Sequence, residues 1–287
     1  MPEQRKYHQV MISYPTTSRI IDERVKSRIM DESLARVRII LVEPAGELNI
    51  GSIARVMKNM GLRQLVLVNP QCEHLGAQAR QMAVHAADIL ETAIVVGTLP
   101  EALTGCYRAI ATTARERSVA TTLEHPRDAL PWLLETPSAL IFGPEDRGLS
   151  NAELNYAGRF VRIPSSPAYP SLNLAESVAI CSYELSQAKK QPVTPGVIPP
   201  ITNPNPPVSL DILEGYYQQL EALLLDIGYL YPHTAASRME KFRRLYNRAG
   251  LSADEVAMLR GILSQVRWAL SQIPPIPSPT TGHPDTR

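Results

Sequence analysis

Short apolar runs alternate with helix-like segments from residue 37 to residue 190, and this alternation limits the possible folds more than any other pattern in the chain. Runs that are bounded by Gly, Pro or Asn predict buried strands at 37–43, 65–70, 94–97, 108–114, 138–143 and 160–164. Apolar residues at helical spacing predict helices at 49–61, 77–90, 99–105, 126–135, 153–158 and 172–190. We therefore expect an α/β fold with a mostly parallel sheet that is covered on both faces.

The loops after the predicted strands are the first indication of function. In open parallel sheets, ligands bind outside the carboxyl ends of the strands. Four loops with distinctive residues follow predicted strands, at 44–51, 112–117, 143–150 and 164–173. Their positions favour one shared ligand site at that edge of the sheet.

The rest of the chain divides by composition. Residues 1–35 lack a clean period and predict an N-terminal extension, and residues 36–190 carry the α/β unit. Residues 191–208 form a proline-rich linker, since seven prolines fall in the seventeen positions of 191–207. Residues 209–273 predict a small helical region of three amphipathic helices, and we expect the proline-rich tail 274–287 to be disordered.

Several classes of protein are excluded by what the sequence contains. No apolar stretch approaches the roughly 18 residues of a membrane span, and no export signal is recognisable, so we expect a cytoplasmic protein. Three distant cysteines and six scattered histidines predict no metal site. Cys106 and Cys181 lie in apolar surroundings typical of core thiols. No histidine has a Ser or Asp partner at the spacing of a hydrolase triad.

Three segments carry the candidate chemistry. NIGSIAR (49–55) predicts a helix start at which Asn49 and Arg55 can hold an anion. The alternative is that Asn49 is only an N-cap and that Arg55 is only a surface residue. FGPEDRGLSNAEL (142–154) turns at Gly143 and then offers Ser150 and Glu153 as a capping box. IPSSPAYPSLNLAESVAI (163–180) places Ser171 and Asn173 at the start of a helix.

The order and spacing of these segments resemble the three motifs of the SPOUT RNA methyltransferases, in the branch that methylates ribose 2′-hydroxyls. TTAR at 112–115 and the helices KFRRLYNRAG and LRGIL narrow the resemblance to the tRNA cytidine/uridine 2′-O-methyltransferases. The resemblance is strong over 36–190 and weaker over 209–270. It implies a SPOUT-type sheet with a C-terminal trefoil knot, a bound S-adenosylmethionine and a homodimer whose active sites are completed across the interface.

The resemblance also assigns residues to roles. It implies Arg55, Asn49 and Ser171 as catalytic residues, and Arg115 and Arg117 as contacts for the RNA backbone. The cofactor pocket would be lined by Thr112, Thr113, Ala114, Gly143, Ile163, Pro170, Ser171 and Leu172. Because arginine is effectively always protonated, we expect Arg55 to grip a phosphate and stabilise the alkoxide rather than to act as a base. No metal is needed, since the sulfonium already makes the methyl group electrophilic.

The C-terminal helices carry a local positive charge. Residues 235–270 contain seven Lys/Arg against three Asp/Glu, a net charge of +4 in a chain whose net charge is +1. Spacings of three and four place Arg238, Lys241, Arg244 and Arg248 on one helix face, and Met239, Phe242, Leu245 and Ala249 on another. This pattern predicts either a tRNA-binding and dimerisation region or an ordinary solvated helix. We expect Tyr216, Tyr217, Tyr229, Tyr231 and Trp268 to serve in packing.

Three functional hypotheses follow. The first is methylation of tRNA at nucleotide 32 of the anticodon loop, and the second is ribose methylation of rRNA or of another tRNA position. The third is a non-catalytic RNA-binding protein, which the retention of Asn49, Arg55 and Ser171 disfavours. The motif GPEDRG has Pro144 and Asp146 where arginines are expected from the resemblance, and Arg147 is the candidate substitute for their RNA contacts.

Overall fold

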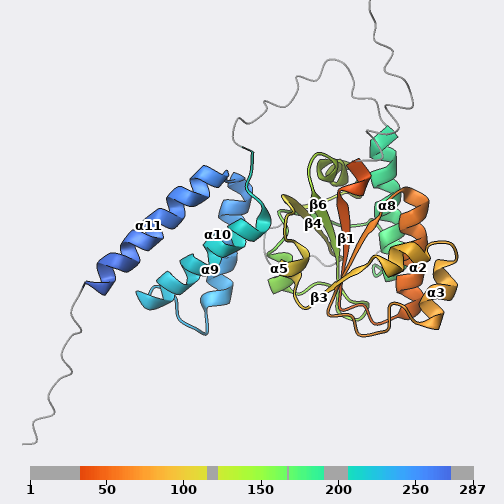
Figure 1. Cartoon of the computed structure of the whole chain (residues 1–287), viewed down its shortest axis with the longest axis horizontal. Helices are drawn as coiled ribbons and strands as arrows, with labels where there is room; N and C mark the ends of the chain where they lie inside the picture. Colours follow the sequence, from red (N-terminus) through yellow and green to blue (C-terminus); the bar gives the residue numbers. More distant parts are fainter. Residues whose placement is uncertain (1–32, 115–121, 167, 191–205, 273–287) are drawn as a thin grey trace, which may run out of the picture.

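A computed structural model describes residues 33–114, 122–166, 168–190 and 206–272 of the protein (Figure 1). The expectations for residues 1–32, 191–205 and 273–287 lie outside these residues. The described chain contains one seven-stranded parallel sheet of order β3-β2-β1-β6-β4-β7-β5. Its strands are β1 (Val37–Val42), β2 (Gln64–Val68), β3 (Ile94–Val96), β4 (Arg108–Thr112), β5 (Leu123–Glu124), β6 (Ser138–Phe142) and β7 (Arg159–Val161).

The sheet is buried on both faces, as the continuous apolar runs predict. Ile39 and Leu41 of β1 pack into one apolar cluster, whereas Ile40 and Val42 point into the other. The first cluster is covered by α2 (Glu47–Met60), α3 (Ala77–Ala83), α4 (Ala87–Glu91), α6 (Pro126–Ala129), the 3₁₀ turn η1 (Leu130–Leu134) and α8 (Leu174–Lys190). The second is covered by α5 (Leu99–Ala102) and α7 (Asn151–Leu154). The predicted parallel α/β fold is confirmed.

Several predicted boundaries are wrong. The segment 77–90 is two helices, because Val84 adopts a left-handed backbone (φ 54°) that ends α3. The segment 126–135 divides into α6 and η1, where Pro131 lacks the N–H that a continuing α-helix needs. Helix α2 begins at Glu47 with Gly46 as N-cap, so Asn49 lies inside its first turn and is not a cap. The two-residue strand β5 was not predicted.

The two core thiols are confirmed. Cys106 and Cys181 are fully buried. Burial raises the pKa of Cys106 to about 11 and that of Cys181 to about 12, so both remain protonated and unreactive near neutral pH. Across the part of the chain with described coordinates, no helix is long and apolar enough to cross a membrane.

The C-terminal region is a unit of three helices with its own apolar core. Its helices are α9 (Leu210–Asp226), α10 (Ala235–Ala249) and α11 (Ala253–Ser271). Tyr216 and Tyr217 are buried in this core with Met239 and Val256, as expected for packing residues. A capping box of Ser252 and Glu255 starts α11. Contrary to expectation, three aromatic side chains are exposed, namely Tyr229, Tyr231 and Trp268.

This helical unit lies beside the α5 side of the sheet (Figure 1). The Leu210 amide donates to the Cys106 carbonyl (2.8 Å), and the Gly105 amide donates to the Asp211 carboxylate (2.9 Å). The Arg243 guanidinium pairs with Glu214 and stacks over the ring of Tyr156 at 5.1 Å. Two hydrogen bonds and one cation–π contact therefore hold the unit against the sheet, whereas the Arg243–Glu214 ion pair lies within the unit, between α10 and α9.

Candidate active site

A hollow of about 140 Å³ opens at the carboxyl ends of β4, β6 and β7. Its walls come from three loops that are far apart in the sequence, at 112–114, 142–149 and 170–177. All the residues that we predicted to line a cofactor pocket do line this hollow, namely Thr112, Thr113, Ala114, Gly143, Ile163, Pro170, Ser171 and Leu172. The switch from strand to loop at one sheet edge brings them together.

Glycine at position 143 is required by a close backbone approach. A Cβ atom built on Gly143 would lie 2.3 Å from the Leu149 nitrogen and 2.4 Å from the Gly148 carbonyl carbon. The loop thus folds back over its own start, and the Gly148 amide donates to the Pro144 carbonyl (2.9 Å). Only a residue without a Cβ leaves room for this turn.

The pocket wall after β4 is held by two hydrogen bonds. The Thr112 hydroxyl donates to the Ile141 carbonyl (3.1 Å), and the Thr113 amide donates to the Val161 carbonyl (3.0 Å). The first bond ties the end of β4 to β6, and the second ties it to β7. The positions of Thr112 and Thr113 are therefore determined by the sheet and not by the loop alone.

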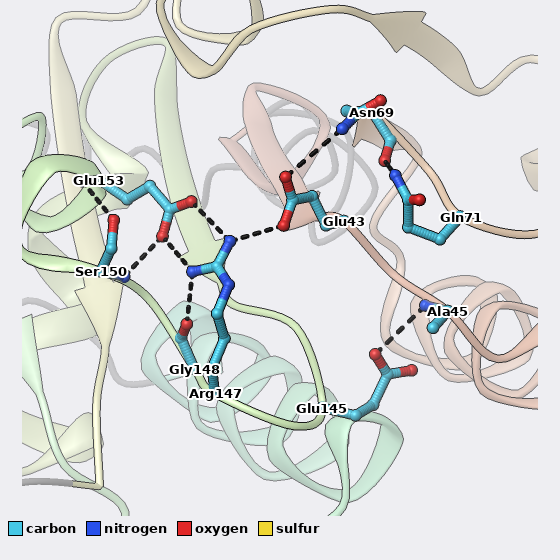
Figure 2. Close-up of polar contacts among 9 residues, drawn as sticks. All are labelled: Glu43, Ala45, Asn69, Gln71, Glu145, Arg147, Gly148, Ser150 and Glu153. Atoms are coloured by element: carbon cyan, nitrogen blue, oxygen red, sulfur yellow. Dashed lines mark hydrogen bonds and ion pairs between the residues drawn. The ribbon is translucent and has the colours of Figure 1, made fainter.

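A polar network joins the three motifs. The Asn49 amide nitrogen donates to the Glu145 carboxylate (2.9 Å), and the Asn173 amide nitrogen donates to the Asn49 oxygen (3.1 Å). Glu145 also accepts from the Ala45 backbone amide (3.2 Å; Figure 2). Sequence reasoning missed Glu145, although a carboxylate two residues after the Gly143 turn was a usable signal.

Asn173 is the N-cap of α8, as its predicted place at the helix start implies. Its side-chain oxygen accepts from the amides of Ala175 (2.8 Å) and Glu176 (3.4 Å). The Glu176 carboxylate accepts from the Asn173 amide (3.3 Å) in return. Ser171, two residues earlier, lines the pocket. The N-cap thus fixes the backbone at Asn173, two residues after Ser171.

Arg55 lies on the exposed face of α2 and does not line the pocket. Neither hydrogen bonds nor ion pairs are found for its side chain among the described residues, whereas Asn49, on the same helix, is held by Glu145 and Asn173. Within a single chain, Asn49 is therefore part of the polar network of the site, whereas Arg55 lies outside this network.

Arg147 is held by two carboxylates, as Figure 2 shows. Its guanidinium donates to Glu43 (2.6 Å) and forms two bonds to Glu153 (3.0 and 3.1 Å). A third group, the Gly148 carbonyl, accepts at 3.0 Å. The two terminal guanidinium nitrogens are engaged in this way, and the hypothesis that Arg147 replaces the missing arginines as an RNA contact stays a prediction.

The candidate RNA-binding residues have different outcomes. Arg115 and Arg117 lie outside the described residues. On α10, Arg238, Lys241 and Arg248 are exposed, whereas Arg244 is half-buried and pairs with Glu240. The predicted apolar face is partly wrong, because Leu245 and Ala249 are exposed. Tyr246 packs against the core of the helical unit in their place.

Comparison with known proteins assigns a class to this fold and pocket. Residues 36–183 match the model of the SpoU rRNA Methylase family, so the α/β unit defines a SpoU-type methylase. Residues 211–274 match the C-terminal domain of the tRNA methyltransferase TrmJ. The second match covers the three helices that pack beside the sheet.

Similar full-length proteins agree with both matches. The tRNA (cytidine/uridine/adenosine-2′-O-)-methyltransferase TrmJ of Pseudomonas aeruginosa (strain UCBPP-PA14) is 42% identical over 245 residues, which cover 82% of this chain and 95% of the relative. The tRNA (cytidine/uridine-2′-O-)-methyltransferase TrmJ of Pectobacterium atrosepticum is 40% identical over 238 residues, with 82% and 98% covered. The chain belongs to the TrmJ family of SpoU-type methyltransferases.

Solved structures show the same architecture. The crystal structure of TrmJ from Z. mobilis ZM4 superposes with a TM-score of 0.71 at 31% identity, covering 80% of this chain and 98% of the other. A probable methylase family protein from Haemophilus influenzae Rd KW20 superposes with a TM-score of 0.54 at 34% identity, with 83% and 98% covered. The sheet and the helical unit therefore both have counterparts in this family.

Proposed function

We propose that this enzyme transfers a methyl group from S-adenosylmethionine to a ribose 2′-hydroxyl of tRNA, at cytidine or uridine 32 of the anticodon loop. The observation that carries the proposal is the pocket at the carboxyl edge of the sheet, which every predicted cofactor residue lines. The names of the relatives support tRNA as substrate and cytidine and uridine as targets, and one of them adds adenosine.

The pocket has the chemistry to hold this cofactor. Its floor offers backbone groups beside Thr113, Gly143 and Leu172, and Glu145 and Asp146 add negative charge to its wall. Carboxylates favour a cationic ligand at close range. Bound there, S-adenosylmethionine supplies a methyl group on a positively charged sulfur. We assign cofactor binding to Thr112, Thr113, Ala114, Gly143, Ile163, Pro170, Ser171 and Leu172.

The chain threading of this family belongs to the same proposal. We expect the loops 143–150 and 163–173 and helix α8 to form a trefoil knot around the cofactor. Two of the three pocket walls come from these segments, and α8 packs against α2. Knots are rare exceptions among folds, and tracing the path of the chain through the loops tests this part directly.

In the proposed mechanism, Asn49 and Ser171 orient the 2′-hydroxyl. The Asn49 side chain uses one N–H and one oxygen lone pair within the network, which leaves one of each for a substrate. Arg55 grips the neighbouring phosphate and stabilises the negative charge that develops on the oxygen. Alignment of the hydroxyl with the methyl carbon supplies the remaining catalysis.

A homodimer is the expected assembly. Leu48 on α2 and Ile180 and Tyr183 on α8 are exposed apolar side chains, and these two helices pack against each other. Such a patch beside Asn49 is suited to a second copy of the chain. The partner would complete the site around Arg55, which a single chain leaves open.

We further propose the division of labour between the domains. Residues 36–190 form the methyltransferase domain, and residues 209–273 form the region for tRNA binding and dimerisation. The exposed Arg238, Lys241 and Arg248 support a phosphate-contacting role for α10, because Lys and Arg side chains provide most contacts to RNA phosphates. Residues 191–208 connect the two.

Incubation with total tRNA, rRNA and methyl-labelled S-adenosylmethionine tests the function. We expect label in tRNA, and nuclease digestion with mass spectrometry to place it on the ribose of nucleotide 32. Label in rRNA or at another tRNA position would replace the proposed target. Cofactor binding without any methyl transfer, or no cofactor binding by calorimetry, would contradict the enzymatic role.

A further inference from the structure

We infer that Arg147 is a positioning residue that holds the cofactor loop against the end of β1. We call Arg147, Glu43 and Glu153 the Arg147 clasp. The inference rests on the proposed function, since it assumes that the hollow binds S-adenosylmethionine. It assigns to Arg147 a role in binding the cofactor and none in binding RNA.

The clasp joins the end of β1 to the loop after β6 and to the helix that follows this loop. Glu43 directly follows β1, Arg147 lies in the loop after β6, and Glu153 lies in α7 (Figure 2). The guanidinium bonds Glu43 at 2.6 Å and Glu153 at 3.0 and 3.1 Å. A planar guanidinium that binds one carboxylate through two N–H groups and a second through another has little rotational freedom. Through Arg147, the loop is therefore held to Glu43 at the end of β1 and to Glu153 in α7.

The clasp acts on pocket residues through the backbone. Arg147 and its neighbours Asp146 and Gly148 line the hollow, and the Arg147 side chain also donates to the Gly148 carbonyl (3.0 Å). The loop must stay folded over Gly143, where the backbone approach leaves no space for a Cβ. A shift at residue 147 thus changes the wall that faces the cofactor.

Glu43 contacts Arg147 from an unusual backbone conformation. Its φ of 47° lies in the left-handed region, which side chains with a Cβ disfavour. The Glu43 amide donates to the Val68 carbonyl (2.8 Å), and the Asn69 side chain donates to the Glu43 carboxylate (3.4 Å). Neighbouring strand ends thus stabilise the conformation that aims Glu43 at Arg147.

The electrostatics agree with the geometry. Burial raises the pKa of the Glu153 carboxyl, but the hydrogen bonds from Arg147 and Ser150 outweigh this effect and lower the pKa overall. The Glu153 carboxylate is consequently charged at neutral pH, beside the Arg147 guanidinium. Isolated pairs on a surface contribute little, whereas a network with bidentate geometry is the recognised exception.

The test compares cofactor binding and RNA binding in Arg147→Ala. We expect the Kd for S-adenosylmethionine, measured by calorimetry, to rise about tenfold. The KM for tRNA should stay within about twofold, because no RNA contact is lost. Arg80→Ala is the matched control, since it removes an exposed arginine–glutamate pair between α3 and α4. Its cofactor Kd should equal that of the wild type.

Two further variants separate positioning from general stability. Arg147→Lys retains one ion pair but not the fork, so we expect a cofactor Kd between those of wild type and Arg147→Ala. Glu43→Gln leaves the Glu153 contacts in place and should raise the cofactor Kd about threefold. Glu43→Gln also carries the test if Arg147→Ala does not fold.

The inference is overturned if Arg147→Ala raises the KM for tRNA and leaves the cofactor Kd unchanged, which would make Arg147 an RNA contact. Equal cofactor Kd values for wild type and both Arg147 variants would overturn it as well. If the wild type itself binds no cofactor, the proposed function fails, and this outcome is distinct from a failure of the clasp.

Discussion

The role inferred for Asn49 changes once its neighbours in the folded chain are known. Read locally, it is a polar residue near a helix start, for which an N-cap is an adequate explanation. In the folded chain it sits within the first turn of α2 and bonds both Glu145 and Asn173. Each motif therefore contributes one side chain to a single network. The local alternative for Asn49 is wrong, because the cap is Gly46.

Arg55 allows a direct test at the residue scale. We expect Arg55→Ala to lower kcat about a hundredfold or more, because the variant loses the charge that stabilises the developing oxyanion. Arg55→Lys retains the charge without the planar fork, so its kcat should be intermediate. The Kd for S-adenosylmethionine should remain unchanged, since Arg55 does not line the pocket. Near wild-type turnover by Arg55→Ala would remove this residue from the mechanism.

Gly143 provides a second test at this scale. In Gly143→Ala the new Cβ would meet backbone atoms at 2.3 and 2.4 Å, so the loop must move. We expect calorimetry to show a loss of cofactor affinity of tenfold or more. Gly97→Ala is the matched control, because the nearest atom to its Cβ is a side-chain oxygen at 3.9 Å. An unaltered cofactor Kd in Gly143→Ala would mean that the loop does not form the binding wall.

At the scale of elements, local signals predicted helix starts better than helix continuity. Capping boxes are short-range patterns, and the one at Ser150 forms as predicted, with a second at Ser252. In contrast, the continuous helix expected at 77–90 is interrupted at Val84 by a left-handed backbone that no residue type there indicates. The faces of α10 were also misassigned, because its packing against α9 decides which side is covered.

Glu153 belongs to this scale, because it caps α7 and anchors the loop before it. Its pKa is lowered in the folded protein, so its contribution to stability is present above the unfolded value near 4.5 and is lost as the pH falls through the folded value. We expect Glu153→Gln to reduce the free energy of unfolding by about 1 kcal/mol at pH 7. Thermal unfolding should show this difference shrinking below pH 4.5.

Glu91→Gln is the matched control for that comparison. Glu91 pairs with Arg80, and both side chains are about half exposed. We expect a change of less than about 0.5 kcal/mol at pH 7, as is usual for an exposed pair. A Glu153→Gln protein as stable as Glu91→Gln at neutral pH would contradict the anchoring role.

The assembly of the whole molecule is tested at the α2–α8 patch. Tyr183 on α8 is 49% exposed and Leu48 on α2 is 50% exposed, and these two helices pack against each other. Tyr183→Asp places a charge in the expected interface, so sedimentation should report a monomer with greatly reduced activity. Tyr107→Asp alters another exposed tyrosine, directly before β4 and outside both helices, and should leave the mass unchanged. A dimeric, active Tyr183→Asp protein would exclude this face as the interface.

The position of the helical unit against the sheet could not be predicted from the sequence. Its helices are evident from their amphipathic periods, and the basic charge of α10 is visible in the composition. From the sequence, Arg243 is one more basic residue of that helix. In the structure, however, its side chain is buried against Glu214 and the ring of Tyr156. Nothing in the spacing of α10 marks Arg243 as different from Arg244 beside it.

The sequence by itself determined the parallel α/β fold, the three-helix unit and the edge of the sheet at which the pocket lies, whereas the residues that line the pocket came from the resemblance to a known family. Apolar periodicity reports burial directly, and the carboxyl ends of parallel strands must meet at one edge. Only the tertiary structure decided that Glu145 joins Asn49 to Asn173 and that Arg147 is bound by Glu43 and Glu153. Except for Arg147 and Glu153, which are six positions apart, these contacts join residues about a hundred positions apart, and the sequence does not record which distant residues meet in the folded chain.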